Sequence, residues 1–486
     1  MIRERRMRHH WGIVAVALAL LAQPGAAAPT RAPAKKAAPA KPVAKPAPAK
    51  PAAKPAAPAN MIPAPLPDTP EIQALRRAFR FGFAPYEMLR TRQAQVARMA
   101  AAGMGTGINA LIPRLTLADA TTREVTTPNN DTLYGSAWLD LSQGPVFFSI
   151  PALKRYHSAA LMSITSDVIA VLGTRTVGAN GGRYAIVGPN WRGDLPAGVE
   201  MVRSQSNDAW LLVRVVVNGE EDLAAAADGL TRYTLSAVAG DTPLDLKVPA
   251  KLNGKAFLTT VNAAIERSGD TLLANRATQF ADQGLGKSWE TLAPEQQKLW
   301  NDSLPALIHE LRGGLTADEG VDGWVYPPFN MALYGEDDDL RARVALGGLA
   351  ALPRIEAIYV SATKDAEGRP LTGAKSWRVK MPGNLPVGAF WSLTMYEQAP
   401  DGRLFFVPND LNRFAVGDRS QHLRPERDGS IELFVQHGKP SGERVVNWLP
   451  APKGKFVLMF RAYLPGAPLL DGSVRLPPVT EDEMIP

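Results

Sequence analysis

The stretch of residues 126–141 places Asn129, Asn130 and Asp131 between a proline and a run that is typical of a β-strand, and Tyr134 follows closely. Amide and carboxylate groups beside an aromatic ring suit a polyhydroxylated ligand, and several oxygens together suit a hard cation such as calcium. The same residue types also form Asx turns that begin strands. Both interpretations stay open, and we assign no metal site to this motif.

A second candidate for chemistry is His157. It could act as a general base that Asp131 or Asp167 orients, whereas a solvent-facing strand histidine is the alternative. The serines nearby are too numerous to nominate one nucleophile. Asp131, His157 and Tyr134 are therefore the candidate catalytic residues of a hydrolase or lyase.

A third set of residues lies in the carboxyl-terminal half. Aromatic surface and hydrogen-bonding groups combine there in Trp391, Tyr396, Asn409 and Arg413. Arg413 could clamp a carboxylate or phosphate, or it could tie its own loop to a neighbouring strand. With Asn129, Asn130, Asp131 and Tyr134, these are the candidate ligand-binding residues.

Familiar catalytic signatures are missing from the sequence. It has no P-loop, no Gly-x-Ser-x-Gly nucleophile elbow and no His-Glu-x-x-His zinc helix. Cysteine is absent, which excludes disulfides, thiolate catalysis and cysteine-based metal sites. No cofactor can be named from the sequence.

The amino-terminal residues point to export. Arginines precede the apolar run 13–22 and a small-residue cleavage site, which predicts a signal peptide over residues 1–27 and a secreted or periplasmic protein. A Pro/Ala/Lys linker over residues 28–66 should lack a fold of its own. Its segment 29–60 is a spacer, or a polycation that binds an anionic envelope polymer.

The net charge of +7 resides in this amino-terminal part. Residues 1–60 contain 11 Lys and Arg and one acid, a net of +10, so the remaining residues sum to −3. Nucleic-acid binding by the folded part therefore has no electrostatic support. No later stretch is long and apolar enough to span a membrane. Homo-oligomerisation stays open.

The elements that must position the candidate residues follow the change of pattern along the chain. A helix should begin at Pro70, capped by Thr69, and kink or break at Pro85. Strands are expected at 146–150, 159–164, 183–188 and 210–217, and helices at 255–268, 293–313 and 337–351. Strands then return from Arg354 onward. We predict a mainly β protein with a helical insertion: a helix plus β-sandwich domain over 67–235, helices over 236–350 and a second β-sandwich over 351–486.

Several blocks of the sequence resemble known bacterial families. TPNNDTLYGSAWLDLSQGP and RYHSAALMSITSD are similar to domain of unknown function twelve-fifty-four. AFWSLTMYE, VPNDLNRFAVGDR and NWLPAPKGKFVLMFRAYLP are similar to its companion, domain of unknown function twelve-fourteen. The resemblance implies an Ig-like β-sandwich, a helical insertion and a carboxyl-terminal jelly roll. It transfers no reaction and no catalytic residue.

The leading hypothesis is a periplasmic binding or accessory protein of the cell envelope whose ligand is a small polar molecule or carbohydrate. Its site would lie between the two sandwiches or in the mouth of the jelly roll. The alternative is an envelope hydrolase or lyase that uses Asp131 with His157 or Tyr134. A third hypothesis is an assembly protein whose Lys/Pro tail docks on anionic envelope material.

Overall fold

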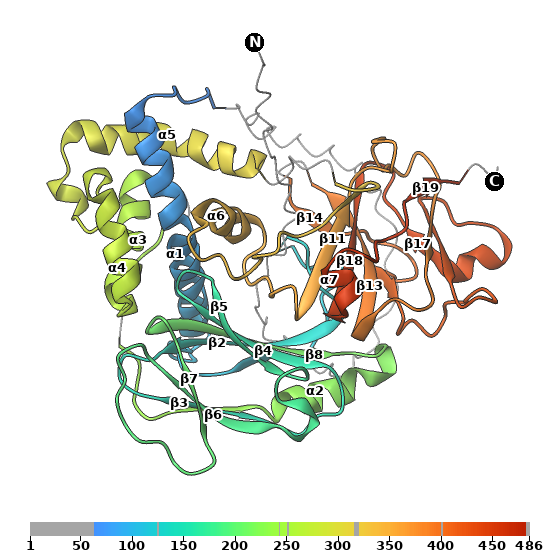
Figure 1. The fold of residues 1–486 in the computed structure, drawn as a ribbon, viewed down its shortest axis with the longest axis horizontal. Helices are drawn as coiled ribbons and strands as arrows, with labels where there is room; N and C mark the ends of the chain where they lie inside the picture. The colour runs from blue at the N-terminus through green and yellow to red at the C-terminus, as the bar shows by residue number, and fades with distance from the viewer. Residues whose placement is uncertain are drawn as a thin grey trace, which may run out of the picture.

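The computed structural model describes residues 63–123, 126–242, 244–249, 252–314, 320–399 and 402–482. The expected signal peptide (1–27) and residues 28–62 of the expected linker lie outside the described residues. The described chain is mainly β with helical parts, which confirms the expected class. Figure 1 shows the helices α1, α3, α4 and α5 on one side, the amino-terminal sheets below them and the carboxyl-terminal sheets beside them.

The amino-terminal β-domain has two sheets that enclose a core made of residues such as Leu133, Phe148 and Leu211. The strand orders are β1-β2-β8-β4-β5 and β7-β6-β3-β9. The predicted strands at 146–150, 159–164, 183–188 and 210–217 correspond to β3, β4, β6 and β8 within two residues at each end. The bounds are β1 Ile112–Arg114, β2 Thr132–Asp140, β3 Val146–Ile150, β4 His157–Ser163, β5 Val168–Gly173, β6 Gly182–Val187, β7 Glu200–Arg203, β8 Asp208–Val216, α2 Leu223–Thr231 and β9 Thr234–Ala237.

Helix α1 begins at Pro70 as expected, because the Thr69 hydroxyl accepts a hydrogen bond from the Ile72 backbone N–H at 3.3 Å. It continues through Pro85 to Ala101 as one helix, so the prediction of a break is wrong. Pro85 is buried, and tertiary packing of the helix offsets the backbone bond that proline cannot make. Further helices are α3 Gly254–Ser268, α4 Thr271–Ala277, α5 Pro294–Gly313 and α6 Asp338–Gly347.

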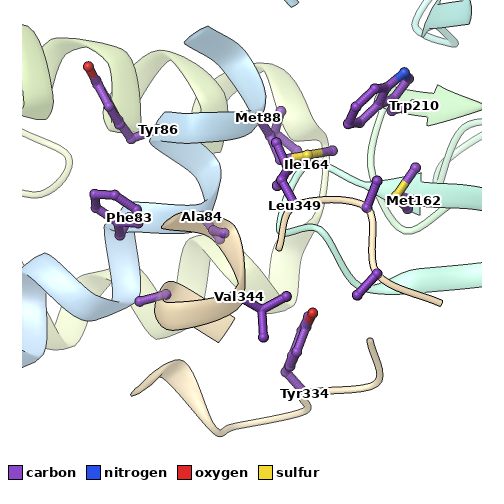
Figure 2. Packing of buried hydrophobic residues seen from close by; sticks show 14 of the residues in the cluster. Phe83, Ala84, Tyr86, Met88, Met162, Ile164, Trp210, Tyr334, Val344 and Leu349 are labelled. Atoms are coloured by element: carbon purple, nitrogen blue, oxygen red, sulfur yellow. The ribbon is translucent and has the colours of Figure 1, made fainter. Parts of the chain in front are cut away.

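These helices pack on the outer face of the sheet that contains β2, β8 and β4. One hydrophobic cluster joins α1 and α6 to Met162 and Trp210 of that sheet. Figure 2 shows Met88 of α1 lying with Ile164 and Leu349, and Trp210 beyond them. Every position of β2, β4 and β8 is buried. The reason is that both faces of their sheet are covered, one by the helices and the other by the second sheet.

The carboxyl-terminal β-domain also has two sheets. The strand orders are β10-β11-β18-β13-β14, with β15 paired to β13, and β17-β16-β12-β19. Leu458, Phe460 and Ala462 of β18 point into the core between these sheets. The bounds are β10 Trp324–Val325, β11 Ala357–Ala362, β12 Trp377–Met381, β13 Val387–Gln398, β14 Leu404–Phe406, β15 Ala415–Gly417, β16 Ile431–Gln436, β17 Trp448–Pro450, β18 Phe456–Pro465, α7 Ala467–Leu470 and β19 Thr480–Glu481.

Side chains alternate across a strand, so the intervening residues of β18 face the opposite way. Tyr463 accordingly belongs to the cluster that also contains Tyr134, Tyr156 and Trp210 of the amino-terminal domain. The outer face of the sheet that contains β18 therefore packs against the amino-terminal domain, and the candidate site lies at this junction.

Candidate functional site

The Asn129–Asp131 motif begins strand β2 by an Asx turn. The backbone N–H of Asp131 donates to Asn129 Oδ1 at 2.7 Å, and β2 starts at the next residue, Thr132. The structural interpretation of this motif is thus confirmed. This Asx turn occupies Asn129 Oδ1 and leaves the other side-chain polar atoms of Asn129 and Asp131 for other contacts.

The remaining polar atoms of Asn129 and Asp131 bind the carboxyl-terminal domain. Asn129 Nδ2 donates to the Tyr463 hydroxyl at 2.8 Å. The two oxygens of the Asp131 carboxylate accept from Ser392 Oγ at 2.7 Å and from Arg419 Nη2 at 2.5 Å. Asp131 is 4% exposed, so these contacts replace its solvation shell.

Strand register brings further polar residues to the same junction. On the amino-terminal side, Tyr134 of β2 lies opposite Arg214 of β8. On the carboxyl-terminal side, Arg461 of β18 lies opposite Tyr359 of β11 and Ser392 of β13. Residues opposite each other in a sheet share a face. Tyr134 and Arg214 therefore lie on one face of their sheet, and Tyr359, Ser392 and Arg461 lie on one face of theirs.

We call the following residues the interface cluster because they are buried, or partly buried in the case of Tyr359, and interact with one another across the junction. Its members are Tyr134, Arg214, Tyr359, Tyr396, Arg461 and Tyr463.

Arg214 and Arg461 are the two cations of the interface cluster, and they are 1% and 0% exposed. Arg214 Nη2 donates to the Ala350 carbonyl at 2.9 Å. Arg461 donates through Nη1 to Thr394 Oγ1 and through Nη2 to the Tyr396 hydroxyl, both at 2.6 Å. Among the described residues, neither guanidinium forms an ion pair with a carboxylate, and Arg214 Nη1 and Arg461 Nε have no hydrogen-bond partner.

The Tyr134 hydroxyl is buried and likewise has no hydrogen-bond partner in the described chain. The Arg214 guanidinium lies 5.6 Å from the centre of the Tyr134 ring. Buried polar groups in native proteins are nearly always paired. Three unpaired buried groups in one cluster therefore require a particular explanation.

Tyr359, Tyr396 and Tyr463 of the interface cluster are neutral hydrogen-bonding groups at physiological pH. Burial raises the pKa of Tyr359 and that of Tyr396 to about 12, although the neighbouring arginines lower both. Burial also raises the pKa of Tyr463 well above its ordinary value. Phenolate charge therefore does not neutralise Arg214 and Arg461 near pH 7.

Arg419 forms the more exposed edge of the junction. It pairs with Asp131, donates to the Val217 carbonyl and lies with its guanidinium carbon 4.0 Å from the Phe390 ring centre. Its side chain retains 18% exposure. Arg419 therefore connects the interior of the junction with its surface.

The structure gives His157 and Asp131 separate partners. His157 Nδ1 lies 2.7 Å from the Tyr233 hydroxyl inside the amino-terminal β-domain. The histidine is fully buried, so the interpretation of a solvent-facing histidine is wrong. Burial lowers the pKa of His157. The Asp167 carboxylate instead accepts from the backbone N–H of Tyr334 at 2.9 Å and from Arg341 Nε at 3.2 Å.

Among the carboxyl-terminal candidates, Tyr396 alone joins the interface cluster. Its hydroxyl donates to the Pro128 carbonyl at 2.5 Å, which places it beside the Asn129–Asp131 motif. Trp391 is in the carboxyl-terminal core. Asn409 closes its own loop, and Arg413 donates to the carbonyls of Val445, Val446 and Trp448, as the loop-tie interpretation expects.

Asn130 is partly buried. In the part of the chain that the structure describes, no group of three His, Asp or Glu side chains is arranged to hold a metal ion.

Sequence reasoning missed Arg214, Arg419, Arg461 and the partners Tyr359, Tyr463 and Ser392. A signal for two of them is present. Arg214 is the single charge in WLLVRVVV, and Arg461 is the single charge in FVLMFRAYL. A lone arginine in a strand that is buried on both faces must find a partner or function there.

The two β-domains on either side of this junction match two different family models. Residues 108–236 match the family described as Protein of unknown function (DUF1254), and residues 356–467 match Protein of unknown function (DUF1214). The chain therefore has the two-domain arrangement of these families. Tyr134 and Arg214 come from the first domain, and Tyr359, Arg461 and Tyr463 from the second.

Comparison with solved structures finds a protein from Vibrio parahaemolyticus with 22% identity and a TM-score of 0.64, covering 85% of this chain and 100% of that chain. That likeness shows a shared fold. An uncharacterised protein from Burkholderia cenocepacia has 14% identity and a TM-score of 0.42, covering 86% of this chain and 91% of that chain. No curated protein matches.

Proposed function

We propose that this two-domain chain binds a small polar ligand at the junction between its domains, through the interface cluster. The observation that carries the proposal is the buried Tyr134 hydroxyl, which has no hydrogen-bond partner in the described chain and lies among tyrosines of the other domain. An unpaired buried hydroxyl costs about 1–3 kcal/mol. A ligand oxygen at this position would remove that cost.

The composition of the cluster also supports the proposal. Domain interfaces are frequent sites for small ligands, which are recognised by a few polar groups on an otherwise apolar wall. Phe390 stacks on Tyr463 with ring centres 4.2 Å apart, so the junction offers an aromatic surface beside hydrogen-bonding groups. This combination suits a molecule with hydroxyl or carboxyl groups.

The proposal keeps the setting that the sequence predicts, a periplasmic or secreted protein with a binding or accessory role in the cell envelope. Its basis is the predicted signal peptide. We also infer that the two sandwiches are the Ig-like and jelly-roll domains that the family resemblance implies. A comparison of the strand order of each sheet with that of solved Ig-like and jelly-roll domains would test this inference.

The alternative, an envelope hydrolase or lyase, lacks a supporting contact. Asp131 binds Ser392 and Arg419, and His157 binds Tyr233. Tyr134 is near the motif, but it makes no hydrogen bond to Asp131 in the described chain. The catalytic hypothesis stays a prediction, and the binding hypothesis has the stronger geometric basis.

A thermal-shift screen of the purified protein against sugars, polyols, small acids and amino acids tests the proposal. A ligand at 100 times its dissociation constant adds about 2.7 kcal/mol to the free energy of unfolding. We expect at least one compound class to raise the midpoint in the wild type and to lose most of that effect in Tyr134→Phe.

Tyr326→Phe is the matched control for this screen. It removes a phenolic hydroxyl that accepts a bond from the Leu476 backbone at 2.8 Å, outside the interface cluster. Its ligand-induced shift should equal that of the wild type. A shift that survives unchanged in Tyr134→Phe would place the ligand elsewhere and reject the proposal.

A further inference from the structure

The charge balance of the interface cluster carries an inference about the kind of ligand. Arg461 has the Asp131 carboxylate in its surroundings, but both oxygens of that carboxylate are engaged by Ser392 and Arg419. Glu356, a second buried carboxylate near the junction, binds Arg175 at 2.8 Å and the Tyr156 hydroxyl at 2.9 Å. Neither carboxylate pairs with Arg214 or Arg461.

Tyr359 interacts with both arginines of the interface cluster. It lies opposite Arg461 in the pairing of β11 with β18. The electrostatic surroundings of its hydroxyl include both Arg214 and Arg461, as well as Tyr134. The two cations and the two tyrosines therefore share one buried region, although they come from different domains.

A buried charge without a counter-ion is costly, because the protein interior solvates it poorly. Two such charges in one region also repel each other. The neutral tyrosine hydroxyls can accept hydrogen bonds from the guanidinium groups, but they supply no negative charge. An anion is the species that would balance this region.

From this we propose that the ligand of the interface cluster is a small anion whose carboxylate or phosphate oxygens accept hydrogen bonds from Arg214 Nη1, Arg461 Nε and the Tyr134 hydroxyl. The inference rests on the proposed function and gives it a chemical class. Guanidinium groups suit oxyanions because they donate several hydrogen bonds in one plane. The residues that would select charge, Arg214 and Arg461, are distinct from the tyrosines that would accept any polar ligand.

Isothermal titration of the full chain with succinate, inorganic phosphate and the neutral polyol erythritol tests the inference. Each probe is titrated at constant ionic strength, so that non-specific screening is the same throughout. We expect succinate or phosphate to bind, and the arm that binds identifies the source of the oxyanion. Arg214→Met and Arg461→Met should each weaken that binding by about 10- to 100-fold, the loss of one charge-assisted hydrogen bond.

The outcomes separate the inference from the proposed function. Binding of erythritol alone, lost in Tyr134→Phe, would overturn the anion and keep the junction as a site for polar ligands. Binding of no probe, together with a negative thermal-shift screen, would overturn both. Equal anion binding by the wild type and both methionine variants would move the anion away from the cluster and overturn the inference.

Folding of the variants can be controlled. Methionine approximates the volume of the arginine stem and removes a buried charge, so we expect each methionine variant to keep the fold. If Arg461→Met fails to fold, Arg461→Lys keeps the charge and removes the planar fork. It should then retain anion binding at reduced affinity, and unchanged affinity would contradict the assigned role of Nε.

Discussion

Asn129 Nδ2 donates a hydrogen bond to the Tyr463 hydroxyl at 2.8 Å, and this bond joins the turn that begins β2 to β18, the central strand of the carboxyl-terminal sheet. Its Oδ1 atom accepts a hydrogen bond from the Asp131 backbone N–H. One side chain thus starts a strand and connects two domains. Stability at the junction and the chemistry of the candidate site therefore depend on neighbouring atoms of one motif.

Tyr463→Phe and Tyr134→Phe should differ in their effect on stability, although both remove a buried hydroxyl. Tyr463→Phe leaves Asn129 Nδ2 without its acceptor and should lower the free energy of unfolding by about 1–3 kcal/mol. Tyr134→Phe removes a hydroxyl without a partner in the described chain and should leave the free energy unchanged or raise it. Urea unfolding without ligand measures both, and equal losses would contradict the assignment of Tyr134.

The Asp131–Arg419 pair should show strong energetic coupling. Asp131→Asn leaves the Arg419 guanidinium without its carboxylate and should cost about 3 kcal/mol. When Arg419→Met is added, the total loss should be smaller than the sum of the two single losses by about 1–3 kcal/mol. A double-mutant cycle in urea measures this difference, and additive losses would show that the pair does not hold the junction.

A second buried ion network should hold the helices on the amino-terminal sheet. Asp208 at the start of β8 pairs with Arg92 of α1 at 3.2 Å and with Arg267 of α3 at 2.8 Å. Asp208→Asn removes the common carboxylate and should lower the free energy of unfolding by about 3–5 kcal/mol.

The exposed pair of Arg232 and Asp228 is the control for that prediction, because its atoms are 3.5 Å apart at the surface. Asp228→Asn should change the free energy of unfolding by no more than about 1 kcal/mol. Similar losses in Asp208→Asn and Asp228→Asn would refute a special role for the buried network.

His157 should make stability depend on pH in a defined direction. Burial lowers its pKa below the ordinary value of 6.5, so the unfolded chain binds a proton at a higher pH than the folded chain. The contribution of His157 to stability is therefore full above about pH 6.5 and declines as the pH falls toward the lowered folded pKa. Unfolding measured between pH 7.5 and 5 should show this decline, and it should be smaller in His157→Gln.

Arg413 should contribute to stability and leave ligand binding unchanged. Its guanidinium donates to three carbonyls around Val446, so Arg413→Met should cost about 1.5–3 kcal/mol. The shift caused by any compound found in the screen should remain that of the wild type. A lost shift with retained stability would return Arg413 to the candidate site.

Much of the fold could be predicted from local pattern. Continuous apolar runs identified β8, and Thr69 with Pro70 identified the start of α1, because these features act within a few residues. Of the two outcomes expected at Pro85, a kink or a break, the break did not occur, since packing of the whole helix outweighs one missing hydrogen bond. The mainly β class followed from the sequence pattern. The packing of α1 against α3 and α6 could not be predicted, because it depends on contacts between residues far apart in the sequence.

The candidate site was less predictable, because its members are far apart in the sequence. The turn-forming role of Asn129 is local and could be predicted, whereas its bond to Tyr463 spans 334 positions. Arg413 was a reasonable candidate by residue type, but the carbonyls that engage it are visible only in the fold. Arg214 and Arg461 were missed because each lies in a strand whose pattern otherwise indicates core.

A crystal structure of the protein with the compound that gives the largest thermal shift would test ligand binding at the interface cluster directly. We expect ligand oxygens within about 3.2 Å of the Tyr134 hydroxyl and of Arg214 Nη1 or Arg461 Nε, between the two domains. A ligand bound elsewhere, with the interface cluster unchanged, would contradict this expectation.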